Sequence, residues 1–188
     1  MNHLGTKTLY TGRLALRKFR DQDAVVMYRN WANDPEVTKY LTWCAHEYME
    51  ETKAYVASLI DSYKQPDNYQ WAIELKDIGE VIGAIGAVKC NVEIGSVHVG
   101  YCIGREWWNQ GITSEALERV IQFFMEEVEV NRVESRHDPR NVNSGKVMQK
   151  CGMQYEGTLR QSDWNNQGVC DACWYSILKE EYFNLKEK

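Results

Sequence analysis

The sequence predicts an α+β fold with one mixed sheet of about seven strands and helices on both faces. Three observations support this prediction. The length of 188 residues suits a single domain, residues 1–188, that buries one substantial core. Segments with the period of strands alternate with segments with the period of helices. No repeat, linker or low-complexity tract divides the chain.

The individual elements follow from periodicity and from turn and cap residues. The strand candidates are residues 9–18, 69–75, 81–90, 97–104, 132–137, 153–160 and 169–178. The helix candidates are residues 21–34, 46–63, 114–127 and 143–151. Asp21 or Asp23 can cap the first helix, which should end near Asp34 because the residue before a proline disfavours helical geometry. Residues 160–168 are expected to form a loop.

Composition and charge exclude several classes of function. With 44% hydrophobic and 26% charged residues, the chain has the composition of an ordinary globular protein. It has no signal-peptide core and no apolar run of the ~20 residues that a membrane span needs. The net charge of −5 argues against nucleic-acid binding. The six scattered cysteines are expected to be reduced. We therefore expect a cytoplasmic protein whose partners are neither nucleic acid nor membrane.

The turn before the third helix candidate has the chemistry of an anion site. A strand at 97–104 leads into it, and a helix from Ser114 follows. The first amides of a helix lack partners inside the helix and face the positive end of its dipole. Gly111 can adopt a positive φ, so the amides of Asn109 to Ser114 can converge on a phosphate. The alternative is a helix start with no ligand.

The residues around this turn resemble a known family. The run from His98 to Leu117, HVGYCIGREWWNQGITSEAL, resembles the acyl-CoA-binding core of the GNAT acetyltransferases. Residues 133–144, 150–157 and 11–17 are similar to further segments of the ribosomal-protein N-terminal acetyltransferases of the RimJ/RimL type. The resemblance implies a mostly antiparallel sheet and direct transfer of acetyl from acetyl-CoA to a primary amine. The acceptor would be a protein N-terminus, a polyamine, an amino acid or an aminoglycoside, and a homodimer is compatible with it.

The resemblance also implies a set of cofactor-binding residues. The pyrophosphate would bind at the glycine turn, and the pantetheine arm along the preceding strand and the start of the next helix. The residues are Tyr101, Cys102, Ile103, Trp108, Asn109, Gln110, Gly111, Ile112, Thr113, Ser114, Asn141 and Ser144. In the family's phosphate motif only Gly111 matches, because Trp108 and Thr113 depart from it. Backbone amides make most of that contact, so the departures bear on affinity more than on identity.

The catalytic residues are less defined than the cofactor site. Ser144 would hydrogen bond the departing thiolate, although it could also be only a helix cap. Asp163 matches a carboxylate of the RimJ/RimL branch, and His98 has a suitable ordinary pKa, so either could be the base, as could a water relay. Met148 stands where some relatives have a tyrosine acid. A covalent role for Cys102 is disfavoured because the sequence places no histidine as its partner.

Other features carry weaker signals. Cys170 and Cys173 have the spacing of half a zinc site, but no second pair follows, so we expect no metal. Asp171 is expected to be structural. Aromatic residues of the acceptor side, mostly expected in the core, are Trp31, Tyr40, Trp43, Tyr48, Trp71 and Trp164. Acidic residues that could attract an amine are Asp34, Glu36, Glu47 and Glu50. A non-catalytic acyl-CoA sensor of the same fold is the alternative function.

Overall fold

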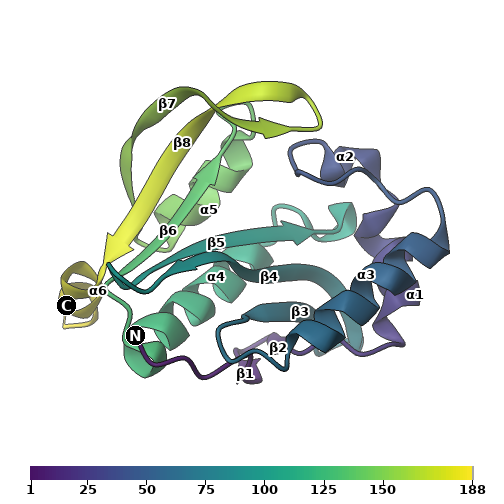
Figure 1. Ribbon diagram of the computed structural model, residues 1–188, viewed down its shortest axis with the longest axis horizontal. Helices are drawn as coiled ribbons and strands as arrows, with labels where there is room; N and C mark the ends of the chain where they lie inside the picture. The colour runs from purple at the N-terminus through teal and green to yellow at the C-terminus, as the bar shows by residue number, and fades with distance from the viewer. Residues whose placement is uncertain (188) are drawn as a thin grey trace.

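One sheet of eight strands organises the chain, of which a computed structural model describes residues 1–187 (Figure 1). The strand order is β1-β2-β3-β4-β5-β6-β8-β7. All neighbours are antiparallel except β5 and β6, which are parallel. The strands are β1 (Leu9–Tyr10), β2 (Leu14–Arg17), β3 (Gln70–Leu75), β4 (Glu80–Asn91), β5 (Ser96–Ile103), β6 (Arg132–His137), β7 (Gln154–Asn165) and β8 (Gly168–Leu178). The predicted fold class is confirmed; the end of the predicted domain, Lys188, lies outside the described residues.

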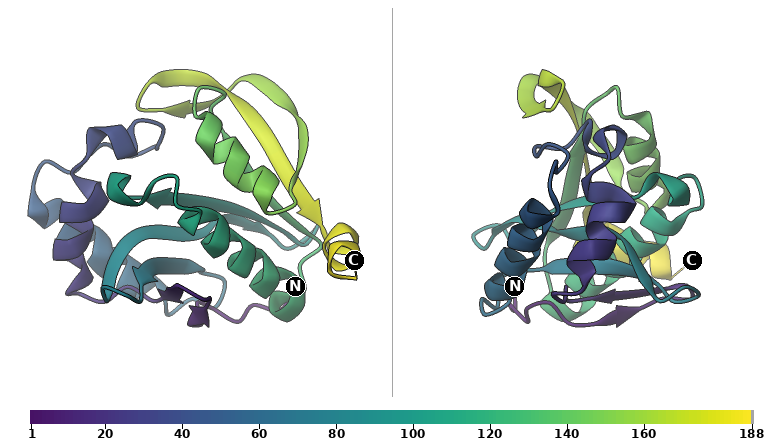
Figure 2. Two further views of the ribbon diagram at one scale, coloured as in Figure 1. Left: turned by 180° about the vertical axis from the view of Figure 1, so that it is seen from behind. Right: turned by 90° about the vertical axis from the view of Figure 1, so that its right-hand side faces the viewer.

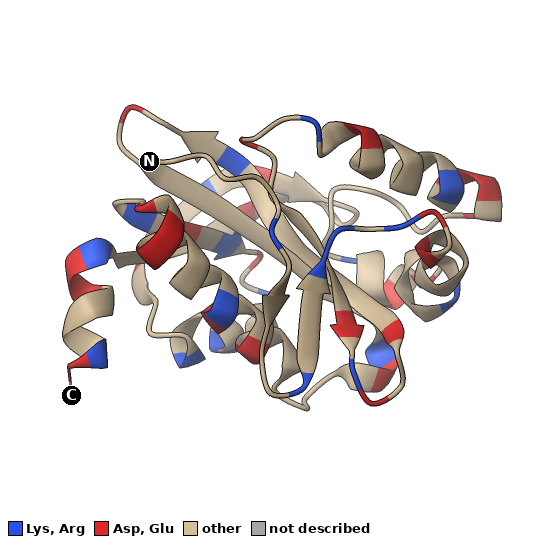
Figure 3. Ribbon diagram, turned by 90° about the horizontal axis from the view of Figure 1, so that it is seen from below, with Lys and Arg blue, Asp and Glu red and all other residues tan. Residues whose placement is uncertain are grey.

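Helices cover both faces of the sheet, as expected. They are α1 (Asp23–Met27), α2 (Pro35–Thr38), α3 (Met49–Ser62), α4 (Ile112–Phe123), α5 (Val142–Lys150) and α6 (Lys179–Lys186). Figures 1 and 2 show α1 and α3 on one face, with α4 and α5 on the other. Among residues 1–187, no helix has both the length and the apolar content to cross a membrane. Acidic and basic residues are interspersed over the elements seen in Figure 3.

The two faces enclose separate apolar clusters. On the α4 face, Trp71 packs edge-on against Phe123 with ring centroids 5.7 Å apart. On the α1 and α3 face, Trp31 and Val56 are fully buried. Trp31 and Trp71 therefore belong to the core, whereas Trp164 is 57% exposed. The apolar side chains of α4 recur at helical spacing, and this stripe seats the helix on the sheet.

Two predicted elements near the N-terminus were wrong in their extent. The strand expected over 9–18 is split, because Thr11 donates its amide to the Leu14 carbonyl (3.0 Å) and so closes a turn between β1 and β2. The helix expected over 21–34 ends as a π-helical turn, Tyr28–Ala32. A new helix, α2, then starts at Pro35, where Asp34 accepts the Glu36 amide (3.0 Å).

The C-terminal region differs more from the prediction. Residues 160–168, expected as a loop, continue β7 to Asn165, with only residues 166–167 between the strands. The family resemblance placed a loop here, but the pairing of Asp163 with Cys170 and of Trp164 with Val169 holds this part in the ladder, and the register is irregular between Leu159 and Asp163. The final helix, α6, was not predicted. The result is a long hairpin that projects beyond β6.

Candidate functional site

The sheet opens between its two parallel strands. β5 and β6 pair only at Ser96, Val97 and His98, and then separate. The Ser135 hydroxyl donates to the Val99 carbonyl (2.7 Å) at the point of divergence. Beyond this bond the edge of β5 faces a gap instead of a strand.

The alternation of the β4–β5 ladder decides which residues of β5 face this gap. Gly104 donates its amide to the Ile82 carbonyl of β4 (2.9 Å). Because bonding residues alternate along an antiparallel ladder, Cys102 also directs its backbone groups to β4. Tyr101 and Ile103 direct theirs to the gap, and the Ile103 carbonyl already accepts from the Trp108 indole (2.9 Å). Tyr101 therefore offers the N–H and C=O that an extended ligand could pair with.

A cleft of about 480 Å³ occupies the gap. All of the predicted cofactor residues line it except Gln110, whose side chain donates to the Glu106 carbonyl, and Ile112, which is buried in the core. Its walls come from α2 and the residues after it, the end of β5, the glycine turn and α5 along its length. Its charged lining residues are Lys39, Arg140, Lys146, Lys150 and Glu36. Basic groups thus outnumber acidic ones here, although the whole chain carries a net charge of −5.

The glycine turn has the backbone geometry of an anion cradle. Gly111 has φ +73° and caps α4, and Asn109 has φ +60°. The helix starts at Ile112, two residues earlier than predicted. Arg13 braces the turn by donating to the Gln110 carbonyl (3.0 Å). These conformations leave the first amides of α4 available at the mouth of the cleft.

Ser144 lies in the cleft next to the end of β5. The Tyr101 hydroxyl donates to the Ser144 carbonyl (3.0 Å) and lies 3.1 Å from its Oγ. Burial raises the pKa of Tyr101, and the hydrogen bond with Ser144 opposes this only in part, so the phenol stays a neutral donor. The Asn141 side chain makes no capping bond to α5. Met148 is fully buried and brings no acid to the site.

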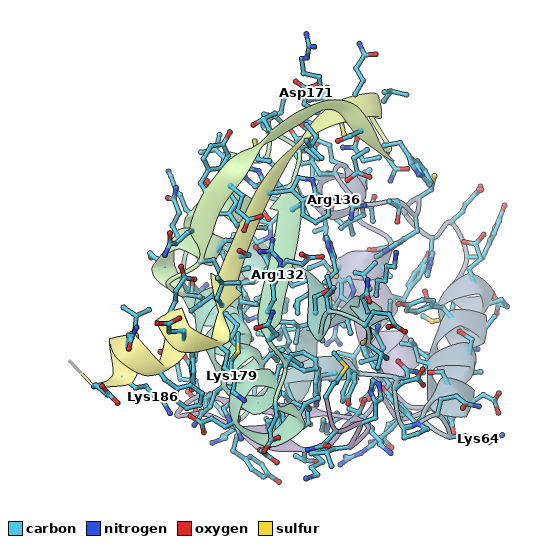
Figure 4. The ribbon with its side chains drawn as sticks, turned by 60° about the vertical axis from the view of Figure 1, so that its left-hand side comes forward. Lys64, Arg132, Arg136, Asp171, Lys179 and Lys186 are labelled. Carbon is cyan, nitrogen blue, oxygen red and sulfur yellow. The ribbon has the colours of Figure 1, made fainter. Side chains whose placement is uncertain are left out.

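The two candidate bases lie together beside the cleft and do not line it. Arg136 donates to both oxygens of Asp163 (2.5 and 3.0 Å) and lies 3.3 Å from Nε2 of His98. Figure 4 labels Arg136 on β6. Burial alone would raise the pKa of Asp163, but the bonds from Arg136 hold it below its ordinary value. Burial, and then the Arg136 charge, lower the pKa of His98 to about 4. A role for either residue as base stays a prediction.

The lowered pKa of His98 predicts a pH dependence of stability. Folded His98 stays neutral down to about pH 4, whereas in the unfolded chain it takes up a proton near pH 6.5. The unfolded state therefore binds more protons in this window, so stability should fall as the pH is lowered from 6.5 to 4. In His98→Gln, urea titrations across this range should show a flatter dependence. An unchanged slope would contradict the assignment.

The structure also places the cysteines and the aspartate for which the sequence suggested other roles. Burial raises the pKa of Cys102 to about 12, which keeps it a thiol and disfavours a covalent role. Cys170 and Cys173 lie three residues apart in β8, so they face opposite sides of the strand. No group of three metal-binding side chains occurs within residues 1–187. Asp171 accepts the Gln161 amide across the hairpin (2.9 Å), which is a structural role.

Comparison with known proteins shows which family has this opened sheet. Residues 13–154 match the acetyltransferase (GNAT) domain family. The chain belongs to the GNAT acetyltransferase family. The predicted resemblance and the predicted enzyme class are thereby confirmed.

Relatives of this GNAT acetyltransferase span most of its length. An uncharacterized N-acetyltransferase, p20, of Bacillus licheniformis is 33% identical over 94% of this chain and 98% of its own. The ribosomal protein uS5 alanine N-acetyltransferase of Escherichia coli is 28% identical over 79% of each chain. The solved RimL structure, a ribosomal L7/L12 N-acetyltransferase in complex with coenzyme A, has a TM-score of 0.81 at 17% identity over 92% of this chain and 98% of its own.

Some residues of the acetyltransferase site were missed by sequence reasoning. Lys146 and Lys150 line the cleft four residues apart on α5, a spacing that places them on one helix face and could have been noticed. Arg136 and Asn166 could not be found in this way, because their partners lie far away in the sequence. A cytoplasmic location and a homodimer stay predictions.

Proposed function

We propose that this acetyltransferase moves acetyl from acetyl-CoA directly to a primary amine, with a protein N-terminus as the first candidate. One observation carries the proposal: a single cleft joins the backbone of Tyr101, the turn at Gly111 and the hydroxyl of Ser144. The relative that acetylates an N-terminal alanine of uS5 supports this choice of acceptor. A polyamine, an amino acid or an aminoglycoside remains the alternative acceptor.

The chain's own groups suit each part of such a ligand. The Tyr101 backbone would pair with the pantetheine amides in the manner of an added strand. The amides of the glycine turn would bind the pyrophosphate, with Lys146 and Lys150 adding positive charge. A backbone N–H of β5 would donate to the thioester oxygen as negative charge develops on it. Trp108 does not block the turn, because its indole is held by Ile103.

Ser144 would complete the reaction at the leaving group. Its hydroxyl would donate to the departing thiolate, while the Tyr101 hydroxyl donates to Ser144 and holds it in place. The proton of the ammonium acceptor needs a base. Because Arg136 hydrogen bonds with both Asp163 and His98, a water that takes the proton from the ammonium and passes it to solvent suits this geometry best.

A thiol-release assay tests the proposed function. The acceptors would be an N-terminal-alanine peptide, spermidine, alanine and kanamycin, each with acetyl-CoA. We expect thiol release above background with at least one, and with the peptide first. Binding of acetyl-CoA without release on any amine would contradict the proposal and leave an acyl-CoA sensor.

Ser144→Ala tests the catalytic assignment within that assay. We expect kcat to fall about tenfold, ~1.4 kcal/mol, because a hydrogen bond to a developing charge is lost. The dissociation constant for CoA should change less than twofold in calorimetry. Ser162→Ala on the exposed hairpin is the matched control and should leave kcat unchanged. Equal kcat values for both variants would remove Ser144 from the mechanism.

A further inference from the structure

Asn166 at the tip of the β7–β8 hairpin binds a segment more than 120 residues away in sequence. Its backbone N–H donates to the Leu41 carbonyl (3.1 Å). Its side-chain Nδ2 donates to the carbonyls of Thr38 (2.8 Å) and Trp43 (2.7 Å). Its Oδ1 accepts from the Cys44 thiol (3.3 Å). One asparagine thus uses its backbone N–H and both ends of its amide on the connection between α2 and α3.

This contact joins the two halves of the opened sheet. Thr38 is the last residue of α2, and residues 39–44 follow it. The cleft wall opposite α5 is lined by Glu36, Val37, Lys39, Tyr40 and Leu41. The hairpin belongs to the other half, beyond the divergence of β5 and β6. Figure 1 shows its tip beside α2, across the opening from β5. Asn166 therefore spans the open end of the cleft, opposite the end where the strands still pair.

The tip of the hairpin is itself held near the start of α5, so its contact with the connection fixes the connection relative to α5. Asn165 donates from Nδ2 to the buried Asp138 carboxylate (2.9 Å). Asp138 in turn accepts from Arg140, which lines the cleft beside α5. A chain of hydrogen bonds thus runs from the connection at 38–44 to the start of α5. Residues 39–48 contain no helix or strand, so these bonds add to the few contacts that hold the connection, such as the packing of Trp43 against Tyr55.

We propose that Asn166 is a positioning residue that sets the acceptor side of the cleft, by holding residues 38–44 at a defined distance from α5. The inference rests on the proposed function, since it assigns the cleft wall after α2 to binding of the acceptor amine. The cofactor side is built from β5, the glycine turn and α5, none of which Asn166 contacts. Loss of the contact should therefore change acceptor binding without changing CoA binding.

The first experiment compares Asn166→Ala with Gln167→Ala, the exposed neighbour at the same tip. With the N-terminal-alanine peptide, we expect Asn166→Ala to raise the acceptor KM about tenfold and to leave the CoA dissociation constant within twofold. Hydrogen exchange of residues 38–44 should speed up in this variant while that of α3 stays constant. Gln167→Ala should match the wild type in all three measurements.

A covalent replacement of the contact tests position separately from side-chain chemistry. Asn166→Cys places a second thiol beside Cys44, and oxidation by copper phenanthroline removes two hydrogens and forms a disulfide. The reduced variant should show the raised KM, and the oxidised variant should recover the wild-type value. Asn166→Cys combined with Cys44→Ser cannot form this link and should stay impaired under both conditions.

The outcomes separate this inference from the proposed function. Peptide turnover with an unchanged KM in Asn166→Ala would overturn the role of Asn166 alone, as would a cross-linked variant that stays impaired. Absence of turnover by the wild type on every amine would refute the proposed function and the acceptor assignment together. Unchanged exchange in residues 38–44 would overturn the structural premise without any activity assay.

Discussion

Arg17→Met should lower the free energy of unfolding by about 3–5 kcal/mol. Arg17 donates to both oxygens of Asp23 (2.7 and 2.9 Å) and to Glu74 (2.5 Å). The side chains of Arg17 and Asp23 are only 8% and 5% exposed. Methionine would fill the volume but leave the Asp23 carboxylate buried without its cation. The loss arises from that unpaired charge and not from a missing contact.

Urea unfolding of two variants checks this mechanism. Arg29→Met breaks an exposed pair with Glu80 and should cost less than about 1 kcal/mol. Arg17→Met combined with Asp23→Leu removes the stranded charge and should regain part of the stability. Equal losses for Arg17→Met and Arg29→Met would show that burial of the pair does not control its contribution.

Gly111→Val should raise the dissociation constant for CoA at least tenfold, about 1.4 kcal/mol. At φ +73° a β-branched residue is strained, so the turn would relax and its amides would no longer converge. An added Cβ would lie 3.8 Å from Arg13, so a clash is not the cause. Calorimetric titration with CoA measures the change.

A second glycine separates strain from loss of the cradle. Gly79 has φ +64° in the turn between β3 and β4, with open space around its Cβ position. Gly79→Val should lose stability for the same backbone reason, yet bind CoA like the wild type. If folded Gly111→Val also binds CoA normally, the glycine turn does not hold the cofactor.

Much of this fold follows from local signals. The strand pattern in residues 97–104 predicted β5, and the helical spacing after Gly111 predicted α4, whose apolar stripe lies on the sheet. The order of strand, glycine turn and helix, together with the family resemblance, also indicated which residues should meet in a cleft. The elements are predictable because their signals lie within a few residues of one another, whereas the grouping of Tyr101 with Ser144 came from the resemblance.

Other features depended on contacts between distant segments. Residues 160–168 were expected to form a loop, but residues 163–165 pair with β8 and so extend β7. Asp163 and His98 are plausible bases in sequence, but Arg136 of β6 binds both. No local pattern predicts these partners, since hydrogen-bond and ion-pair geometry arises only after the strands assemble.

By itself, the sequence determined the α+β class and the family, because backbone periodicity and a glycine turn are encoded locally. The residues of the cofactor cradle stay a prediction from the same local signals. Tertiary structure alone decided where β5 and β6 part, which backbone groups of β5 face the gap, and how Asn166 closes its open end. Each of these depends on bonds between residues far apart in the chain, whose free energy is realised only when both partners are already in place.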